Sequence, residues 1–98
     1  MTRPEDLRHN RELWDLVNDQ FSGADGLELW RRADIVWGLF ATPESVVDVL
    51  GDVAGLDVVE LGCGTAHFSA WLARLGARTV AIDQSGAQLA SARAAQAE

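Results

Sequence analysis

The hydrophobic positions along this chain follow two different periods, and the change falls near residue 55. Before it, apolar residues recur at intervals of three and four, the spacing that places them on one face of an amphipathic helix. This pattern predicts a first helix over residues 4–21 and a second over residues 27–36. Residues 22–26 contain two glycines and predict a break between the two helices.

A third helix is predicted to begin at Thr42-Pro43-Glu44. Threonine suits the capping position, proline suits the first helical position, and an acid is favourable near the positive end of a helix. Valine and leucine follow at helical spacing, and Gly51 marks the expected end. Helices are therefore expected throughout residues 1–55.

The second half of the chain alternates between short β-branched segments and helical patterns. Residues 57–61 and 79–82 are predicted strands, and residues 67–75 and 86–97 are predicted helices. Residues 62–66 form a glycine-rich turn between the first strand and its helix. The order strand, helix, strand, helix predicts that the two strands are parallel neighbours joined by a right-handed crossover.

The glycine-rich turn is the most informative feature of the sequence. Gly62 and Gly64 have no side chain to keep a ligand away from the backbone. The turn also follows a strand directly, and open α/β sheets bind ligands at the carboxyl ends of their strands. Asp83 comes at the end of the next strand, where its carboxylate can accept hydrogen bonds from both hydroxyls of a ribose. These features together predict a ligand that contains a nucleoside.

Two residues argue against a dinucleotide as that ligand. The dinucleotide fingerprint needs a third small residue for close packing, but His67 stands at that position. Glu60 stands two residues before the first glycine, where an acid gives no advantage to pyrophosphate binding. A ligand with a positive centre and no phosphate would tolerate Glu60 far better.

The segment Glu60-Leu61-Gly62-Cys63-Gly64-Thr65-Ala66 resembles motif I of the class I S-adenosylmethionine-dependent methyltransferases. Ala66 stands where that family usually has a third glycine. The segment Val80-Ala81-Ile82-Asp83-Gln84-Ser85 resembles the next family motif, a hydrophobic strand that ends in an acid before a helix.

The resemblance implies roles for individual residues. Asp83 would hold the ribose hydroxyls, and Gln84 would lie beside the adenine ring. Family members often carry N-terminal helices as a lid over the cofactor, and Trp14, Trp30 and Trp37 lie in the corresponding region. Trp37 is the preferred candidate for a lid contact, because Trp14 and Trp30 fall on apolar helical stripes that favour core packing. The remaining cofactor-binding candidates lie in the segment that resembles motif I and would line the loop and the methionine part of the cofactor: Glu60, Gly62, Cys63 and Gly64. No catalytic residue is identified.

The resemblance also implies the fold class, α/β, as the N-terminal half of a Rossmann-like three-layer sandwich preceded by helices. Residues 1–55 would be a helical lid or extension, and residues 56–98 the first βαβα of a cofactor-binding domain. The implied function is methyl transfer from S-adenosylmethionine to an acceptor, expected to be a small molecule. Because no acceptor site can be recognised, we expect the 98-residue chain to be a fragment that is not competent alone.

Composition narrows the choice of partners. Eight basic and fifteen acidic residues give a net charge of −7, which argues against nucleic acid or an anionic membrane as a partner. The single cysteine is typical of a reducing cytoplasm and, with two histidines, predicts no metal site. Cys63 lacks a base or cation that would make it a nucleophile.

A short parallel sheet also leaves an unpaired edge through which the chain can self-associate.

Two alternatives remain open at the level of sequence. The chain can be a catalytically inactive fragment or interaction protein that keeps the first half of the fold. It can also be an NAD(P)-dependent oxidoreductase, although His67 and Glu60 fit that function poorly. Titration with S-adenosylmethionine and with NAD separates the two cofactor hypotheses.

Overall fold

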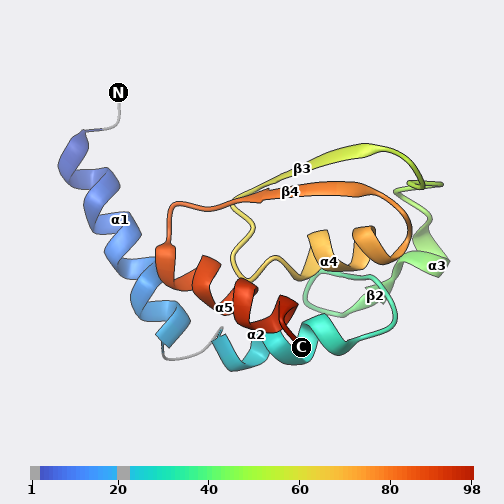
Figure 1. The fold of residues 1–98 in the computed structure, drawn as a ribbon, viewed down its shortest axis with the longest axis horizontal. Coiled ribbons are helices and arrows are strands. Elements are labelled where there is room, and N and C mark those ends of the chain that lie inside the picture. Colours follow the sequence, from blue (N-terminus) through green and yellow to red (C-terminus); the bar gives the residue numbers. More distant parts are fainter. Residues whose placement is uncertain (1–2, 20–22) are drawn as a thin grey trace.

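The computed structural model describes residues 3–19 and 23–98 and combines five helices with two small sheets in that part of the chain (Figure 1). In chain order the elements are α1 (Pro4–Val17), α2 (Gly23–Arg31), β1 (Val36–Trp37), β2 (Thr42–Pro43), α3 (Glu44–Val47), β3 (Asp57–Leu61), α4 (His67–Arg74), β4 (Arg78–Ile82) and α5 (Gly86–Gln96).

The second half of the chain has the predicted order of elements. β3 and β4 are parallel and in register, with Val59 opposite Val80 and Leu61 opposite Ile82. α4 connects them and α5 follows β4, each within a few residues of its predicted bounds. The prediction succeeded here because strand, turn and helix signals lie within a few residues of one another.

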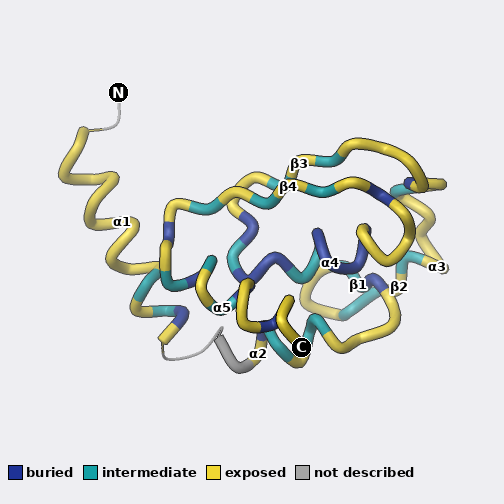
Figure 2. Tube along the Cα trace, viewed as in Figure 1, coloured by how far each residue is buried: buried dark blue, intermediate teal, exposed yellow. Residues whose placement is uncertain are grey.

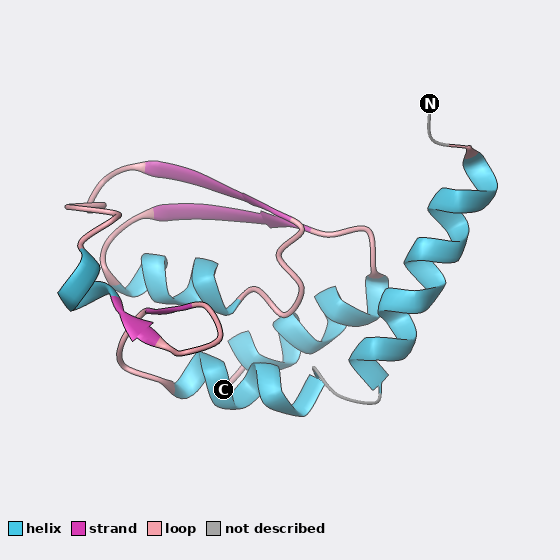
Figure 3. Ribbon diagram, turned by 180° about the vertical axis from the view of Figure 1, so that it is seen from behind, coloured by secondary structure: helices cyan, strands magenta, loops and turns pink. Residues whose placement is uncertain are grey.

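Helices cover one face of the parallel sheet, so the described residues form no three-layer sandwich. α4 and α5 lie beneath β3 and β4, with α2 below them (Figures 1 and 3). Exposed and half-buried residues alternate along both strands (Figure 2), so the exposed residues share the opposite face. The apolar residues of that face are Val59, Leu61, Val80 and Ile82. The expected third layer is therefore absent from residues 3–19 and 23–98, and self-association through the sheet edge stays a prediction.

The second helix differs from its prediction at both ends. α2 begins at Gly23 and includes Gly26, where we expected a break, and it ends at Arg31 instead of Val36. Gly26 is buried, and a Cβ placed on it would come within 2.6 Å of all three heavy atoms of the Thr65 side chain. Glycine is thus needed here for close packing against the turn after β3, a reason that local sequence patterns do not reveal.

The predicted third helix is reduced to the single turn of α3, and Thr42 lies in β2 instead of capping a helix. β2 pairs with β1 in a small antiparallel hairpin, so residues 1–55 are not helical throughout. The Glu44 carboxylate accepts hydrogen bonds from the backbone N–H groups of Val49 and Leu50, at 3.0 and 2.9 Å. These bonds favour a tight turn over continuation of the helix.

The main core lies between α4, the hairpin and the start of β3. Trp71 of α4 is 3% exposed, and its indole N–H donates to the carbonyl of Leu29 in α2 at 2.9 Å. The buried members of this cluster are Ile35, Val53, Trp71, Leu72 and Ala77. Burial of these side chains fixes α2 and the hairpin against α4.

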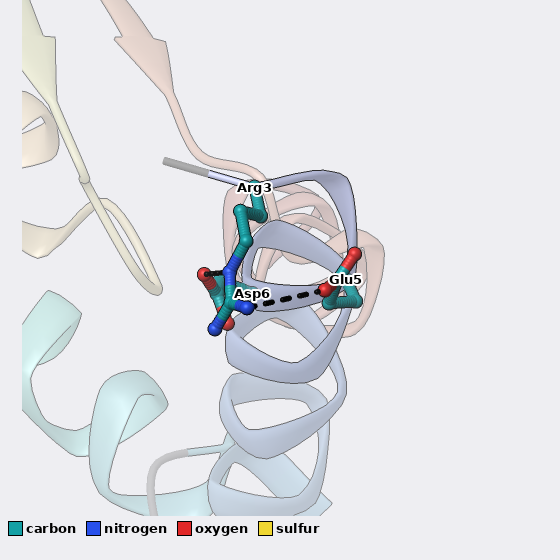
Figure 4. A network of polar contacts seen from close by, with 3 residues as sticks. All are labelled: Arg3, Glu5 and Asp6. Carbon is teal, nitrogen blue, oxygen red and sulfur yellow. Dashed lines mark hydrogen bonds and ion pairs between the residues drawn. The ribbon is translucent and has the colours of Figure 1, made fainter. Parts of the chain in front are cut away.

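α1 extends away from this core and buries none of its residues between Pro4 and Val17. At its first turn Arg3 forms ion pairs with Glu5, at 3.7 Å, and with Asp6, at 3.2 Å (Figure 4). All three side chains are exposed, so these pairs contribute little to stability. The contacts that place α1 on the rest of the molecule lie at its other end.

Candidate functional site

The turn after β3 takes a backbone conformation that explains its glycines. Gly62 and Gly64 have positive φ angles of 67° and 58°, and Ala66 follows with a φ of 62°. Glycine adopts this left-handed region without strain, whereas alanine adopts it at a cost of about 1 kcal/mol. Ala66 is buried beside Cys63 and Ala92, so its methyl group contributes packing that offsets part of that cost.

Asp83 ties this turn to the end of β4. Its Oδ2 accepts a hydrogen bond of 2.8 Å from the backbone N–H of Gly64, and its Oδ1 accepts one of 2.8 Å from the backbone N–H of Ser85. The structure therefore brings together the turn and the acid that the sequence separates by nineteen residues. A carboxylate offers about four lone-pair positions, so Asp83 can still accept hydrogen bonds from a ligand.

Glu60 points under the sheet toward the start of α4. Its Oε1 accepts hydrogen bonds from the backbone N–H and the hydroxyl of Ser69, at 3.1 and 2.7 Å. Ser69 is the third residue of α4, whose N-cap, Ala66, makes no side-chain capping bond. Glu60 therefore supplies the cap from the neighbouring strand, and its negative charge lies at the positive end of the helix.

A cavity of about 480 Å³ lies at the carboxyl ends of the two parallel strands. Leu61, Gly62 and Gly64 form one wall, and Ile82, Asp83 and Gln84 form another. Trp14 of α1 and Gln88 of α5 complete the lining. The cavity has the size of a small-molecule site and combines apolar walls with a few polar groups.

Some of the predicted site residues line this cavity and others do not. Gly62, Gly64, Asp83 and Gln84 line it, whereas Trp37 does not. Trp37 packs against Phe68 with ring centroids 5.0 Å apart, and its indole N–H donates to Glu44 at 3.0 Å. Trp14 is the tryptophan that reaches the cavity, although its place on an apolar helical stripe favoured core packing.

Cys63 and Glu60 lie behind the turn and outside the cavity lining. Cys63 is 5% exposed, and burial, together with the charges of Glu60 and Asp83, raises the pKa of its thiol to about 11. Cys63 is therefore a neutral thiol at physiological pH and not a nucleophile.

His67, the first residue of α4, packs against Trp71 and Phe68 with ring centroids 5.0 and 5.5 Å apart. Burial lowers the pKa of its imidazole, and the charge of Glu60 opposes this shift only in part. His67 is thus a neutral packing residue near pH 7.

α2 supports the glycine-rich turn although it lies outside the β3–α4–β4–α5 unit. This contact was not predicted from the sequence. The indole N–H of Trp30 donates a hydrogen bond of 2.5 Å to the carbonyl of Thr65. Gly26 contacts the side chain of the same threonine. Two residues four positions apart on one helix therefore hold the turn in place.

Residues 3–19 and 23–98 contain neither a cluster of metal-binding side chains nor a helix that could span a membrane. Within these ranges no three His, Cys, Asp or Glu side chains lie close enough together to hold a metal ion. None of the helices described there has the length and apolar character needed to span a membrane.

Residues 58–98 match the family model of a methyltransferase domain. The match spans β3 to α5 and so includes the glycine turn and Asp83. For this part of the chain, which is less than half of its length, the match agrees with the resemblance to class I S-adenosylmethionine-dependent methyltransferases. It gives no support to an NAD(P)-dependent oxidoreductase. No curated protein and no solved structure matches the chain closely enough to count as a relative.

Proposed function

We propose that the cavity at the carboxyl ends of β3 and β4 binds S-adenosylmethionine, and that the protein takes part in methyl transfer to a small-molecule acceptor. The observation that carries this proposal is the joint position of Gly64, Asp83 and Gln84 in the lining of one cavity. A nucleoside could approach the backbone closely at Gly64, donate hydrogen bonds from its ribose hydroxyls to Asp83, and place its base beside the amide of Gln84.

The residues at the two helix N-termini favour this cofactor over a dinucleotide. A pyrophosphate binds at the N-terminus of the helix that follows the glycine turn. In this protein the Glu60 carboxylate already accepts the hydrogen bond of Ser69 at that place. The N-terminus of α5 is similarly occupied by the carboxylate of Asp15, which accepts hydrogen bonds from Ser85 and Ala87. A ligand without phosphate and with a positive centre fits these charges.

Each candidate residue has a part in holding such a cofactor. Asp83 would accept the ribose hydroxyls while it keeps the turn closed through Gly64. Gly62 and Gly64 would allow the ligand to approach the backbone, and Gln84 would lie beside the adenine ring. Glu60 and Cys63 act from behind the turn, Glu60 by capping α4 and Cys63 by packing.

When bound, S-adenosylmethionine supplies a methyl group on a positively charged sulfur, which leaves as a neutral thioether when the acceptor attacks in line. The protein therefore needs to position the acceptor and exclude water, and it needs no nucleophile of its own. The neutral thiol of the buried Cys63 and the neutral imidazole of the half-buried His67 agree with this requirement. We propose that residues 56–98 hold the cofactor and residues 1–55 cover it, in a cytoplasmic protein.

Titration of the purified 98-residue chain with S-adenosylhomocysteine by calorimetry tests this proposal. We expect saturable binding, and we expect NAD to produce no heat above dilution. Asp83→Ala should abolish the binding, while Asp57→Ala, at an exposed strand position outside the cavity, should preserve it. Tight binding of NAD without any response to S-adenosylhomocysteine would overturn the proposal.

A further inference from the structure

α1 carries a tryptophan to the candidate site but is not held there by a hydrophobic core. Trp14 is 45% exposed, and it lines the same cavity as Gly62, Gly64 and Asp83. Figure 1 shows α1 beside the end of the molecule where β4 leads into α5. A large aromatic side chain left half exposed over a cavity has apolar surface that a ligand can cover.

Polar contacts to α5 determine where α1 lies. Oδ1 of Asp15 accepts hydrogen bonds from the hydroxyl of Ser85 and, at 3.3 Å, from the backbone N–H of Ala87. One turn further along, Oδ1 of Asn18 accepts a hydrogen bond of 2.7 Å from the hydroxyl of Ser91. Ser85 is fully buried, so the contact with Asp15 is shielded from water.

We infer that Trp14 stacks on the purine ring of the bound nucleoside, and that Asp15 is the positioning residue that keeps Trp14 over the cavity. The inference rests on the proposed function, because it requires a ligand with an aromatic base. Asp15 and Trp14 are adjacent on α1, so the hydrogen bonds of Asp15 set the position of this helix directly beside the indole. Gln84, in the lining of the same cavity, would contact the edge of the base whose face Trp14 covers.

Substitutions at Trp14 test the stacking contact, with S-adenosylhomocysteine as the probe. Stacking of a base on an aromatic side chain contributes enough that Trp14→Ala should weaken binding about tenfold. Trp14→Phe keeps an aromatic face and should retain most of the affinity, while the quenching of tryptophan fluorescence on binding should diminish. Leu16→Ala is the matched control, because Leu16 is similarly exposed on the same helix and does not line the cavity.

Substitutions at Asp15 test the positioning contact. Asp15→Asn retains the oxygen that accepts both hydrogen bonds and should bind S-adenosylhomocysteine like the wild type. Asp15→Ala removes that oxygen and should weaken binding several-fold. In a protein that already carries Trp14→Ala, the same substitution should cause no comparable loss of affinity. Equal losses for Asn and Ala at this position would contradict a positioning role.

The outcomes distinguish the stacking inference from the proposed function on which it rests. If the wild type fails to bind S-adenosylhomocysteine, the proposed function is wrong and the inference fails with it. If the wild type binds and Trp14→Ala binds equally well, the proposed function stands and the stacking inference is overturned. Urea unfolding of each variant without ligand shows whether a loss of affinity reflects a loss of fold.

Discussion

The carboxylate of Asp83 accepts a hydrogen bond of 2.8 Å from the backbone N–H of Gly64, and it thereby closes the turn after β3 onto the end of β4. The same carboxylate accepts a second bond from the backbone N–H of Ser85, at the start of α5. One side chain therefore connects both loops that border the candidate cofactor site. Structure and ligand binding should both depend on it.

Asp83→Ala should lower the free energy of unfolding by about 2 kcal/mol, because two backbone donors lose their acceptor. Asp83→Asn keeps one acceptor oxygen and should cost about half as much. Urea denaturation measures both losses. Equal stability of wild type and Asp83→Ala would show that the two hydrogen bonds are replaced by water without cost.

Glu60→Ala should destabilise the protein by about 1 kcal/mol, since α4 loses the side chain that caps it. Glu60→Gln retains an acceptor oxygen for Ser69 and should lose less. The coupling between Glu60 and Ser69 can be measured with Ser69→Ala in a double-mutant cycle. A coupling energy near zero would contradict the capping role.

Gly26→Ala should destabilise the protein, although alanine is favoured over glycine in a helix by about 1 kcal/mol. The new methyl group would lie within 2.6 Å of the Thr65 side chain, and such overlap typically costs about 1–3 kcal/mol. Gly86→Ala is the control, because a Cβ there meets nothing within 4 Å. Thermal unfolding should show a lower midpoint for Gly26→Ala and an unchanged or higher one for Gly86→Ala.

The free energy of unfolding should fall as the pH decreases from about 7.5 to about 5, in part because of His67. Burial lowers the pKa of His67 below its ordinary value of 6.5, so the unfolded chain binds a proton more readily than the folded one. The contribution of His67 to the free energy of unfolding is complete above the pKa that His67 has in the unfolded chain, and it is lost as the pH falls below that pKa. In His67→Gln this part of the pH dependence should disappear, whereas an identical slope in both proteins would exclude His67 as its source.

The strand and helix boundaries of residues 57–96 follow from the sequence with little help from the rest of the chain. Alternation of β-branched and helical patterns places β3, α4, β4 and α5, and the glycines place the turn. Gly62, Gly64, Asp83 and Gln84 meet around one cavity because parallel neighbouring strands must end at the same edge. The parallel pairing of the two strands therefore brings together residues that are far apart in the sequence.

The N-terminal region was predicted less well, and the reasons lie in contacts between distant residues. The helix-breaking propensity of Gly26 is overridden by its packing against Thr65. The apolar pattern after Pro43 does not form a long helix, because Glu44 accepts hydrogen bonds from the backbone a turn later. Helical periodicity carries no information on either contact.

The sequence by itself determined the βαβα unit, its glycine turn and the acid at the end of β4, because each depends on residues that are close together along the chain. Tertiary structure alone decided that Trp14, and not Trp37, reaches the cavity. The position of α1 depends on Asp15 meeting Ser85, seventy residues away. Such a contact is specified by the packing of whole elements, and no local pattern of apolar and polar residues encodes it.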